Sequence, residues 1–196
     1  MKRLTSILAA MMMAAAAFTL TGCDEDDDIA STLWGVWEGD MYVSSYYGGD
    51  YYDASYSEIA FDKDPYDYAS GTGYWIDYYS NAPWDYHANH IQWYVNNGVI
   101  SINFIEDGGS VDIYDYSLNS NYFTGVIYND YGEALSFSLT KTAAPDWGDY
   151  EWGWDYGYGY NAPSHAKQKS MGADKEKAAP VRHFGRKDEQ KPMIVK

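Results

Sequence analysis

The middle of the chain contains eight short runs of alternating or β-branched and aromatic residues, separated by clusters of Gly, Asn, Asp and Pro. Such runs are typical of strands, and no helical pattern lies between them to allow parallel crossovers. The sequence therefore predicts an all-β fold, an eight-stranded antiparallel up-and-down barrel whose closure removes exposed strand edges. The predicted strands span residues 34–43, 55–62, 71–79, 89–95, 99–105, 110–118, 122–128 and 134–140.

The connections between the later runs have the chemistry of tight hairpins. Asn96-Asn97-Gly98 and Asp107-Gly108-Gly109 combine residue types that accept a positive φ at little cost. Residues 119–121 and 129–132 have a similar composition. These turns predict that successive runs pair with each other in chain order.

Alternation assigns an inward face to most of the runs. In the run 71–79, aromatic residues occupy both phases, so its inward face stays open. In the other runs, the apolar phase predicts the wall of the interior: Ile91, Trp93, Val95, Ile100, Ile102, Phe104, Phe123, Gly125, Ile127, Leu135, Phe137 and Leu139.

The charge of the chain is strongly acidic and unevenly distributed. The formal net charge is −16, yet residues 1–22 carry +2 and residues 165–196 carry +5, which leaves about −23 on the middle. An acidic middle repels phosphate backbones, so we expect no nucleic-acid partner. The orderly stretch is long enough for one domain with one core.

The N-terminus has the pattern of a targeting segment, predicted to span residues 1–22. Lys2 and Arg3 precede a short apolar run that is too short for a comfortable membrane span. Leu20-Thr21-Gly22-Cys23 then resembles the bacterial lipobox, which implies lipidation of Cys23 and a membrane partner through that anchor. Cys23 is the only cysteine, and the alternative is a leftover reactive thiol.

The five acids that follow Cys23 allow two interpretations. Asp24 to Asp28 resemble the export signal of surface lipoproteins in Bacteroidetes-type bacteria, which implies an outer-membrane lipoprotein on the cell surface. The simpler interpretation is a solvated, flexible tether over residues 23–31, and both can be true. The alternative location faces the periplasm.

A family resemblance begins at Gly35-Val36-Trp37 and covers about residues 31–142. A Gly-x-Trp at the first strand of an eight-stranded meander resembles the lipocalin-like barrels, and residues 71–79 and 114–125 are similar to stretches of small lipocalin-like lipoproteins. The resemblance implies a barrel domain over residues 32–142, in which the tryptophan closes one end under a basic side chain of the last strand. Trp37 and Lys141 are the matching pair here.

An eight-stranded barrel either fills with side chains or holds one small ligand. For a shallow pocket at the open end, each candidate aromatic also has the simpler interpretation of a core or surface strand residue. The candidate ligand-binding residues are Trp75, Tyr79, Trp84, Tyr86, Trp93 and Tyr94.

The sequence contains few residues in the patterns typical of catalytic or metal sites. His87 and His90 are three residues apart, which places them on opposite faces of a strand, and no further Cys or His completes a usual metal set. No nucleophile elbow, phosphate loop or dinucleotide fingerprint is present. We therefore expect no enzyme, no cofactor and no metal.

Two segments of different composition follow the barrel. Residues 143–163 are rich in aromatic residues and Gly, and are either a flexible strip that partly packs on the barrel or a surface that stacks on sugars or a partner protein. Residues 164–196 are polar and basic, which predicts a disordered tail.

The expected function is a surface-tethered, non-enzymatic protein that binds a small apolar or amphipathic ligand at the barrel mouth. One alternative is a carbohydrate- or protein-binding module that uses surface aromatics. The other is a structural envelope component with a filled barrel.

Overall fold

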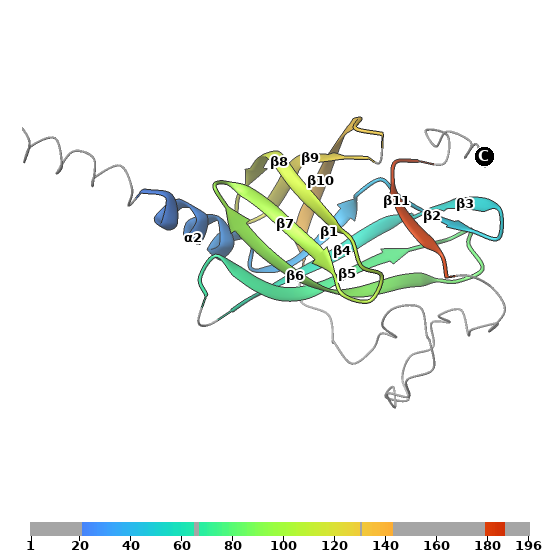
Figure 1. Cartoon of the computed structure of the whole chain (residues 1–196), viewed down its shortest axis with the longest axis horizontal. Coiled ribbons are helices and arrows are strands. Elements are labelled where there is room, and N and C mark those ends of the chain that lie inside the picture. The colour runs from blue at the N-terminus through green and yellow to red at the C-terminus, as the bar shows by residue number, and fades with distance from the viewer. Residues whose placement is uncertain (1–20, 65–66, 130, 143–178, 187–196) are drawn as a thin grey trace, which may run out of the picture.

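The computed structural model describes residues 21–64, 67–129, 131–142 and 179–186. Eight antiparallel strands close into a barrel in the order β1-β10-β9-β8-β7-β6-β5-β4, so β1 pairs with both β10 and β4 (Figure 1). The predicted fold class is therefore confirmed. The barrel strands are β1 (Gly35–Asp40), β4 (Tyr56–Lys63), β5 (Ser70–Tyr78), β6 (Tyr86–Asn96), β7 (Val99–Phe104), β8 (Ser110–Leu118), β9 (Tyr122–Tyr128) and β10 (Ala134–Thr142).

Each of the eight predicted runs corresponds to one barrel strand, with boundaries that differ by a few residues. The hairpin chemistry explains the order of the strands. At the β6–β7 turn, Asn97 has a φ of 51° and Gly98 a φ of 73°. These are the left-handed conformations that a two-residue hairpin turn requires.

A second, three-stranded sheet lies beside one end of the barrel, in the order β11-β2-β3. It consists of β2 (Val43–Tyr47), β3 (Asp50–Asp53) and β11 (Val181–Phe184). β2 and β3 form a hairpin around Gly48 and Gly49, which the sequence analysis did not predict because these strands are short and polar.

β11 corrects the prediction that all of residues 164–196 are disordered. Residues 181–184 form a strand antiparallel to β2, with Arg182 opposite Ser45. Residues 164–178 and 187–196 of the tail, and the aromatic strip 143–163, lie outside the described residues.

The acidic stretch also differs from a flexible tether. Residues Thr21–Leu33 form the helix α2, and Asp26 docks the helix on the β6–β7 turn. Its carboxylate accepts hydrogen bonds from the backbone N–H groups of Asn97 (3.0 Å) and Gly98 (2.9 Å). The stretch after Cys23 is therefore held against the barrel, while residues 1–20 of the predicted targeting segment 1–22 lie outside the described residues.

The barrel interior is packed with the residues that alternation placed inward. All of them are buried except Leu135, which is half-buried. In β5 the structure selects Trp75 for the inward face, so Tyr74 and Ile76 point outward. A second buried cluster on the outer face of β1, β4, β5 and β6 consists of Val36, Ala60, Tyr74, Ile76, Tyr86 and Ala88.

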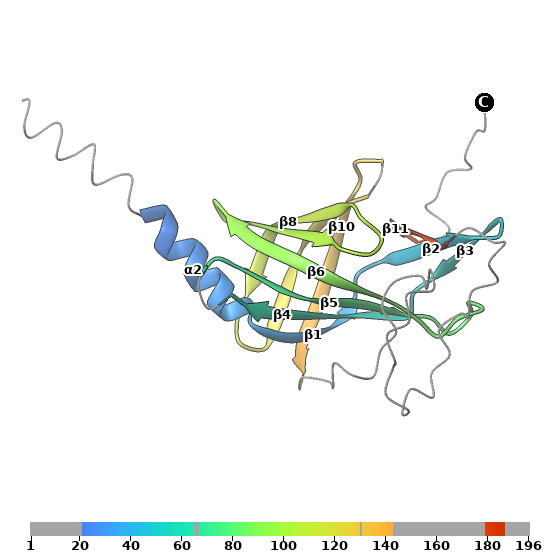
Figure 2. The same ribbon diagram turned by 60° about the horizontal axis from the view of Figure 1, so that its bottom comes forward.

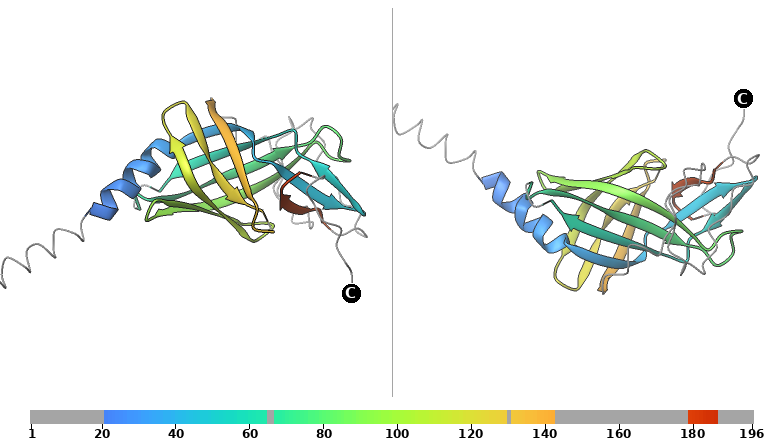
Figure 3. Two further views of the ribbon diagram at one scale, coloured as in Figure 1. Left: turned by 90° about the horizontal axis from the view of Figure 1, so that it is seen from above. Right: turned by 90° about the horizontal axis from the view of Figure 1, so that it is seen from below.

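The two ends of the barrel are structurally different. Figures 1 and 2 show α2 at one end and the small sheet at the other. Figure 3 shows β11 beside β2 at the end away from α2. We call this second end the mouth, and it is the end at which Asp40, Tyr56, Tyr78, Tyr86 and Phe104 begin or end their strands.

Candidate functional site

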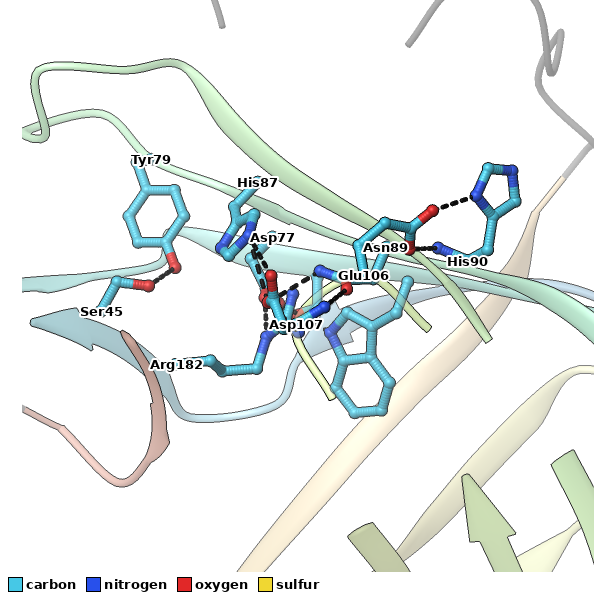
Figure 4. A network of polar contacts seen from close by, with 11 residues as sticks. Ser45, Asp77, Tyr79, His87, Asn89, His90, Glu106, Asp107 and Arg182 are labelled. Atoms are coloured by element: carbon cyan, nitrogen blue, oxygen red, sulfur yellow. Dashed lines mark hydrogen bonds and ion pairs between the residues drawn. The ribbon is translucent and has the colours of Figure 1, made fainter. Parts of the chain in front are cut away.

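A group of polar side chains, most of them buried, lies at the mouth of the barrel (Figure 4). Asp77 on β5 faces His87 on β6 in the strand register, and Asn89 lies two residues further along β6 on the same side. Asp107 comes from the β7–β8 connection and Arg182 from β11. We call these five residues the mouth cluster.

Asp77 is fully buried and its carboxylate is completely satisfied. Its Oδ1 accepts hydrogen bonds from Ser57 Oγ (2.6 Å) and Trp75 Nε1 (2.7 Å). Its Oδ2 accepts from Arg182 Nε at 2.8 Å. A buried carboxylate is costly unless it is paired and hydrogen-bonded, so Arg182 compensates a charge that the barrel itself carries.

Asp107 receives most of the remaining donors of the cluster. His87 Nε2 donates to Oδ1 (3.2 Å), and Asn89 Nδ2 (2.9 Å) and Arg182 Nη1 (3.2 Å) donate to Oδ2. Burial alone would raise the pKa of Asp107, but the hydrogen bond and charge of His87, with Arg182 and Asn89, outweigh it and lower the pKa. Asp107 is therefore an anion at neutral pH.

Arg182 brings the guanidinium group that joins the two carboxylates. Its side chain is only 5% exposed, and its guanidinium carbon lies 4.4 Å from the ring centroid of Phe104. Burial would lower the pKa of Arg182, yet the charges of Asp77 and Asp107 raise it, so the group is a cation. Its Nη2 is buried and has no hydrogen-bond partner within the described ranges.

Aromatic side chains surround the mouth cluster. Trp75 packs edge-on against Phe104 and against Phe184 of β11, at centroid distances of 5.4 and 5.9 Å. Tyr79 forms a 2.7 Å hydrogen bond with Ser45 of β2, and burial, together with the charge of Asp77, raises its pKa. These contacts join the small sheet to the barrel.

Trp84 completes this aromatic wall. It is buried among three tyrosines, with its ring centroid 5.4 Å from Tyr47, 5.3 Å from Tyr52 and 5.4 Å from Tyr79. Three of the six predicted ligand residues, Trp75, Tyr79 and Trp84, therefore lie at the mouth.

The structure places the other three predicted ligand residues elsewhere. Trp93 lies toward the α2 end, where it packs against Phe61 and donates to the Thr72 carbonyl oxygen at 2.9 Å. Tyr86 belongs to the outer cluster, and Tyr94 is 43% exposed on the outer face of β6. The six residues do not line one pocket, and Trp93, Tyr86 and Tyr94 have the packing of core or surface strand residues.

At the opposite end, Gly35, Trp37 and Lys141 form the contact that the family resemblance implies. Lys141 Nζ lies 4.9 Å from the Trp37 ring centroid, and Trp37 Nε1 donates to the Leu33 carbonyl oxygen of α2 at 2.7 Å. A Cβ atom on Gly35 would lie 2.5 Å from Lys141 Cε, and its φ of 127° favours glycine. This triad closes the α2 end.

Four members of the mouth cluster were missed by the sequence analysis, but alternation holds a signal for two of them. Once Trp75 is known to face inward, Asp77 shares its phase in β5, and Asn89 shares the phase of Ile91 in β6. Asp107 looked only like a turn residue. No pattern in the sequence indicates Arg182, because it lies 40 residues beyond Thr142, where the last barrel strand ends.

The two carboxylates of the cluster bind the Arg182 guanidinium. Ser57 donates to Asp77 and not to His87, so the described residues lack a Ser–His bond of the kind that activates a nucleophile. His87 and His90 lie on opposite faces of β6, where His90 Nδ1 contacts Glu106 at 2.6 Å. Within the same ranges, no three His, Cys, Asp or Glu side chains are grouped to hold a metal ion.

The helices that the structure describes include none that is long and apolar enough to span a bilayer. This finding concerns helices only.

Comparison with known proteins agrees with the architecture. Residues 33–125, from the end of α2 into β9, match the family model described as a lipocalin-like domain. No match was found among the curated proteins or among the solved structures. Lipocalin-like domains are generally binding folds and not enzymes. The family match and the closed eight-stranded barrel together support a lipocalin-like domain in this chain.

Proposed function

We propose that the chain is a surface-exposed outer-membrane lipoprotein of the Bacteroidetes type, anchored through Cys23, whose barrel binds a small amphipathic ligand at the mouth. The role is binding and not catalysis. The ligand's apolar part packs against Trp75, Tyr79 and Trp84, and its polar part meets the mouth cluster.

The main support is the difference between the two halves of the barrel interior. Toward α2 the space is filled by Trp37, Phe61, Trp93 and Phe123, all with essentially no exposure. At the mouth, aromatic side chains surround a buried polar cluster. Binding sites for small molecules commonly combine apolar walls with a few placed polar groups.

The position of the anchor is consistent with this role. Cys23 lies near the start of α2, at the end of the molecule opposite the mouth. A lipid attached there leaves the mouth directed away from the bilayer. A ligand would then enter from the side remote from the membrane.

A structural component with a filled barrel is the second candidate, and the dense packing toward α2 favours it. It predicts no small-molecule binding. A glycan- or protein-binding module would instead use exposed aromatics such as Tyr94, Tyr122 and Tyr128.

Fluorescence titration of the full-length lipoprotein in detergent with the probe N-phenyl-1-naphthylamine tests the proposal. We expect saturable binding that Trp84→Leu weakens at least about tenfold, since the substitution removes a buried aromatic wall. Tyr94→Leu is the matched control on the outer face and should bind as the wild type does. No saturable binding, or equal loss in both variants, would contradict a ligand site at the mouth.

A further inference from the structure

The geometry points to a more specific role for the mouth cluster, which rests on the proposed function. We propose that the cluster is a binding site for a guanidinium or ammonium group of the ligand. In this structure Arg182 of β11 occupies the site as an internal competitor.

The barrel itself contributes the negative charge of the site. Asp77 and Asp107 both belong to the barrel segment, and both direct a carboxylate oxygen at the same guanidinium group. His87 donates to Oδ1 of Asp107 and Asn89 donates to Oδ2, which also accepts a hydrogen bond from Arg182. Without Arg182, the mouth cluster retains two carboxylates and contains no other Lys or Arg among its described residues. This arrangement attracts a cation.

The shape of the site favours a planar cation. Arg182 lies over the face of Phe104, with Nε on one carboxylate and Nη1 on the other. A planar guanidinium fits this arrangement better than a compact ammonium, because its donors are fixed in one plane. We therefore expect guanidinium ligands to bind more tightly than matched amines.

Arg182 fits the site incompletely. Its Nη2, one of the three nitrogens of the group, is buried and lacks a hydrogen-bond partner among the residues that the structure describes. A buried donor without a partner is unfavourable, because it loses its water and gains no hydrogen bond in return. A free ligand, which is not constrained by a strand, is able to adopt a position that satisfies this donor or leaves it solvated.

The strand β11, which carries Arg182, lies outside the barrel. The eight strands close without it, and among the strands that the structure describes β11 pairs only with β2, over four residues. Near its end, Gly185 N donates to the Tyr42 carbonyl oxygen (2.6 Å) and Ser44 Oγ donates to the Gly185 carbonyl oxygen (2.8 Å). Release of β11 therefore breaks the edge of the small sheet and leaves the backbone pairing of the eight barrel strands intact.

The neighbouring aromatic contact defines the rest of the ligand. Phe184 packs on Trp75, and Trp75 donates to the same Asp77 that binds Arg182. A molecule with a cationic group and an aromatic or apolar group a short distance away would replace both Arg182 and Phe184. The expected ligand class is an amphipathic cation.

Isothermal titration calorimetry with 2-phenylethylguanidine tests the proposal on the full chain. We expect Arg182→Ala to bind this probe at least about tenfold more tightly than the wild type, because the internal competitor is gone. Arg186→Ala is the matched control, since Arg186 contacts Asp40 and the Ala54 carbonyl oxygen and none of the five cluster residues in the described contacts. It should bind as the wild type does, and 2-phenylethylurea, which is neutral, should not bind to Arg182→Ala.

A folded Arg182→Ala variant that does not bind the guanidinium probe would overturn the proposal. If this variant does not fold, hydrogen exchange of the wild type replaces the titration. A high concentration of the probe should then accelerate exchange in residues 181–184 and leave β6 and β7 unchanged, and unchanged exchange in residues 181–184 overturns the proposal. Binding of N-phenyl-1-naphthylamine without any response to guanidinium would preserve the proposed function and reject this inference.

Discussion

Removal of the Arg182 guanidinium should be among the most destabilising single changes in the barrel mouth. Arg182→Ala leaves Asp77, which has no solvent exposure, without its cation and removes the contact with Phe104. Breaking a buried ion pair by removing one partner costs about 3–5 kcal/mol of unfolding free energy. Since domains are stable by about 5–15 kcal/mol, the variant is expected to remain folded in mild conditions.

Arg186→Ala provides the comparison on the same segment. Arg186 pairs with Asp40, whose side chain is 41% exposed, so its loss should cost no more than about 1 kcal/mol. The second comparison is Asp77→Asn combined with Arg182→Ala, which removes the buried charge as well as its partner. The double variant should recover part of the loss, with a coupling energy of about 2 kcal/mol.

Urea unfolding followed by tryptophan fluorescence measures these free energies. Urea is preferred because a guanidinium salt would itself compete for the cluster. Equal costs for Arg182→Ala and Arg186→Ala, or additive effects of Asp77→Asn and Arg182→Ala, would refute the assignment of a buried, coupled ion pair.

Three further predictions concern other parts of the molecule. Gly35→Ala should lower the unfolding free energy by about 1–3 kcal/mol in urea, because the left-handed backbone and Lys141 leave no room for a Cβ; an unchanged midpoint would contradict this packing. Burial raises the pKa of Glu58, partly offset by a hydrogen bond from Tyr74, so wild-type stability should fall as pH rises above 4.5 through the folded pKa. Glu58→Gln should flatten that dependence and gain at most about 1 kcal/mol at pH 7, and an unaltered pH profile would argue against it. Cys23→Ala should move the protein from the membrane to the soluble fraction in its own host, whereas retention at the membrane would exclude the lipid anchor.

Much of the barrel could be predicted because its strands obey a simple physical rule. Inward residues such as Ile100 and Phe137 alternate with polar neighbours, and the inward phase of these strands is the one that the closed sheet buries in its interior. The turn at Asn97-Gly98 was readable because its backbone needs residues that accept a positive φ. In β5 the pattern failed, because Tyr74 and Ile76 are buried on the outer face while Trp75 is buried inside.

The mouth was less predictable because it depends on contacts that are remote in sequence. Arg182 meets Asp77 across 105 residues and Asp107 across 75, and neither separation leaves a local pattern. β11 is a short strand in a basic tail, and its position is set by those carboxylates and by Trp75. The ligand residues chosen for their aromatic character were therefore split between the mouth, the core and the outer surface.

Native mass spectrometry of the full-length protein, taken gently from the membranes of its own host, tests the central claim most directly. The account predicts a reproducible extra mass on the folded protein, separate from the lipid on Cys23 and lost on denaturation. It also predicts that added 2-phenylethylguanidine displaces the bound molecule, so that the signal of the extra mass decreases. A folded protein that carries only its lipid, in repeated preparations, would contradict a ligand-binding mouth and favour the filled-barrel alternative.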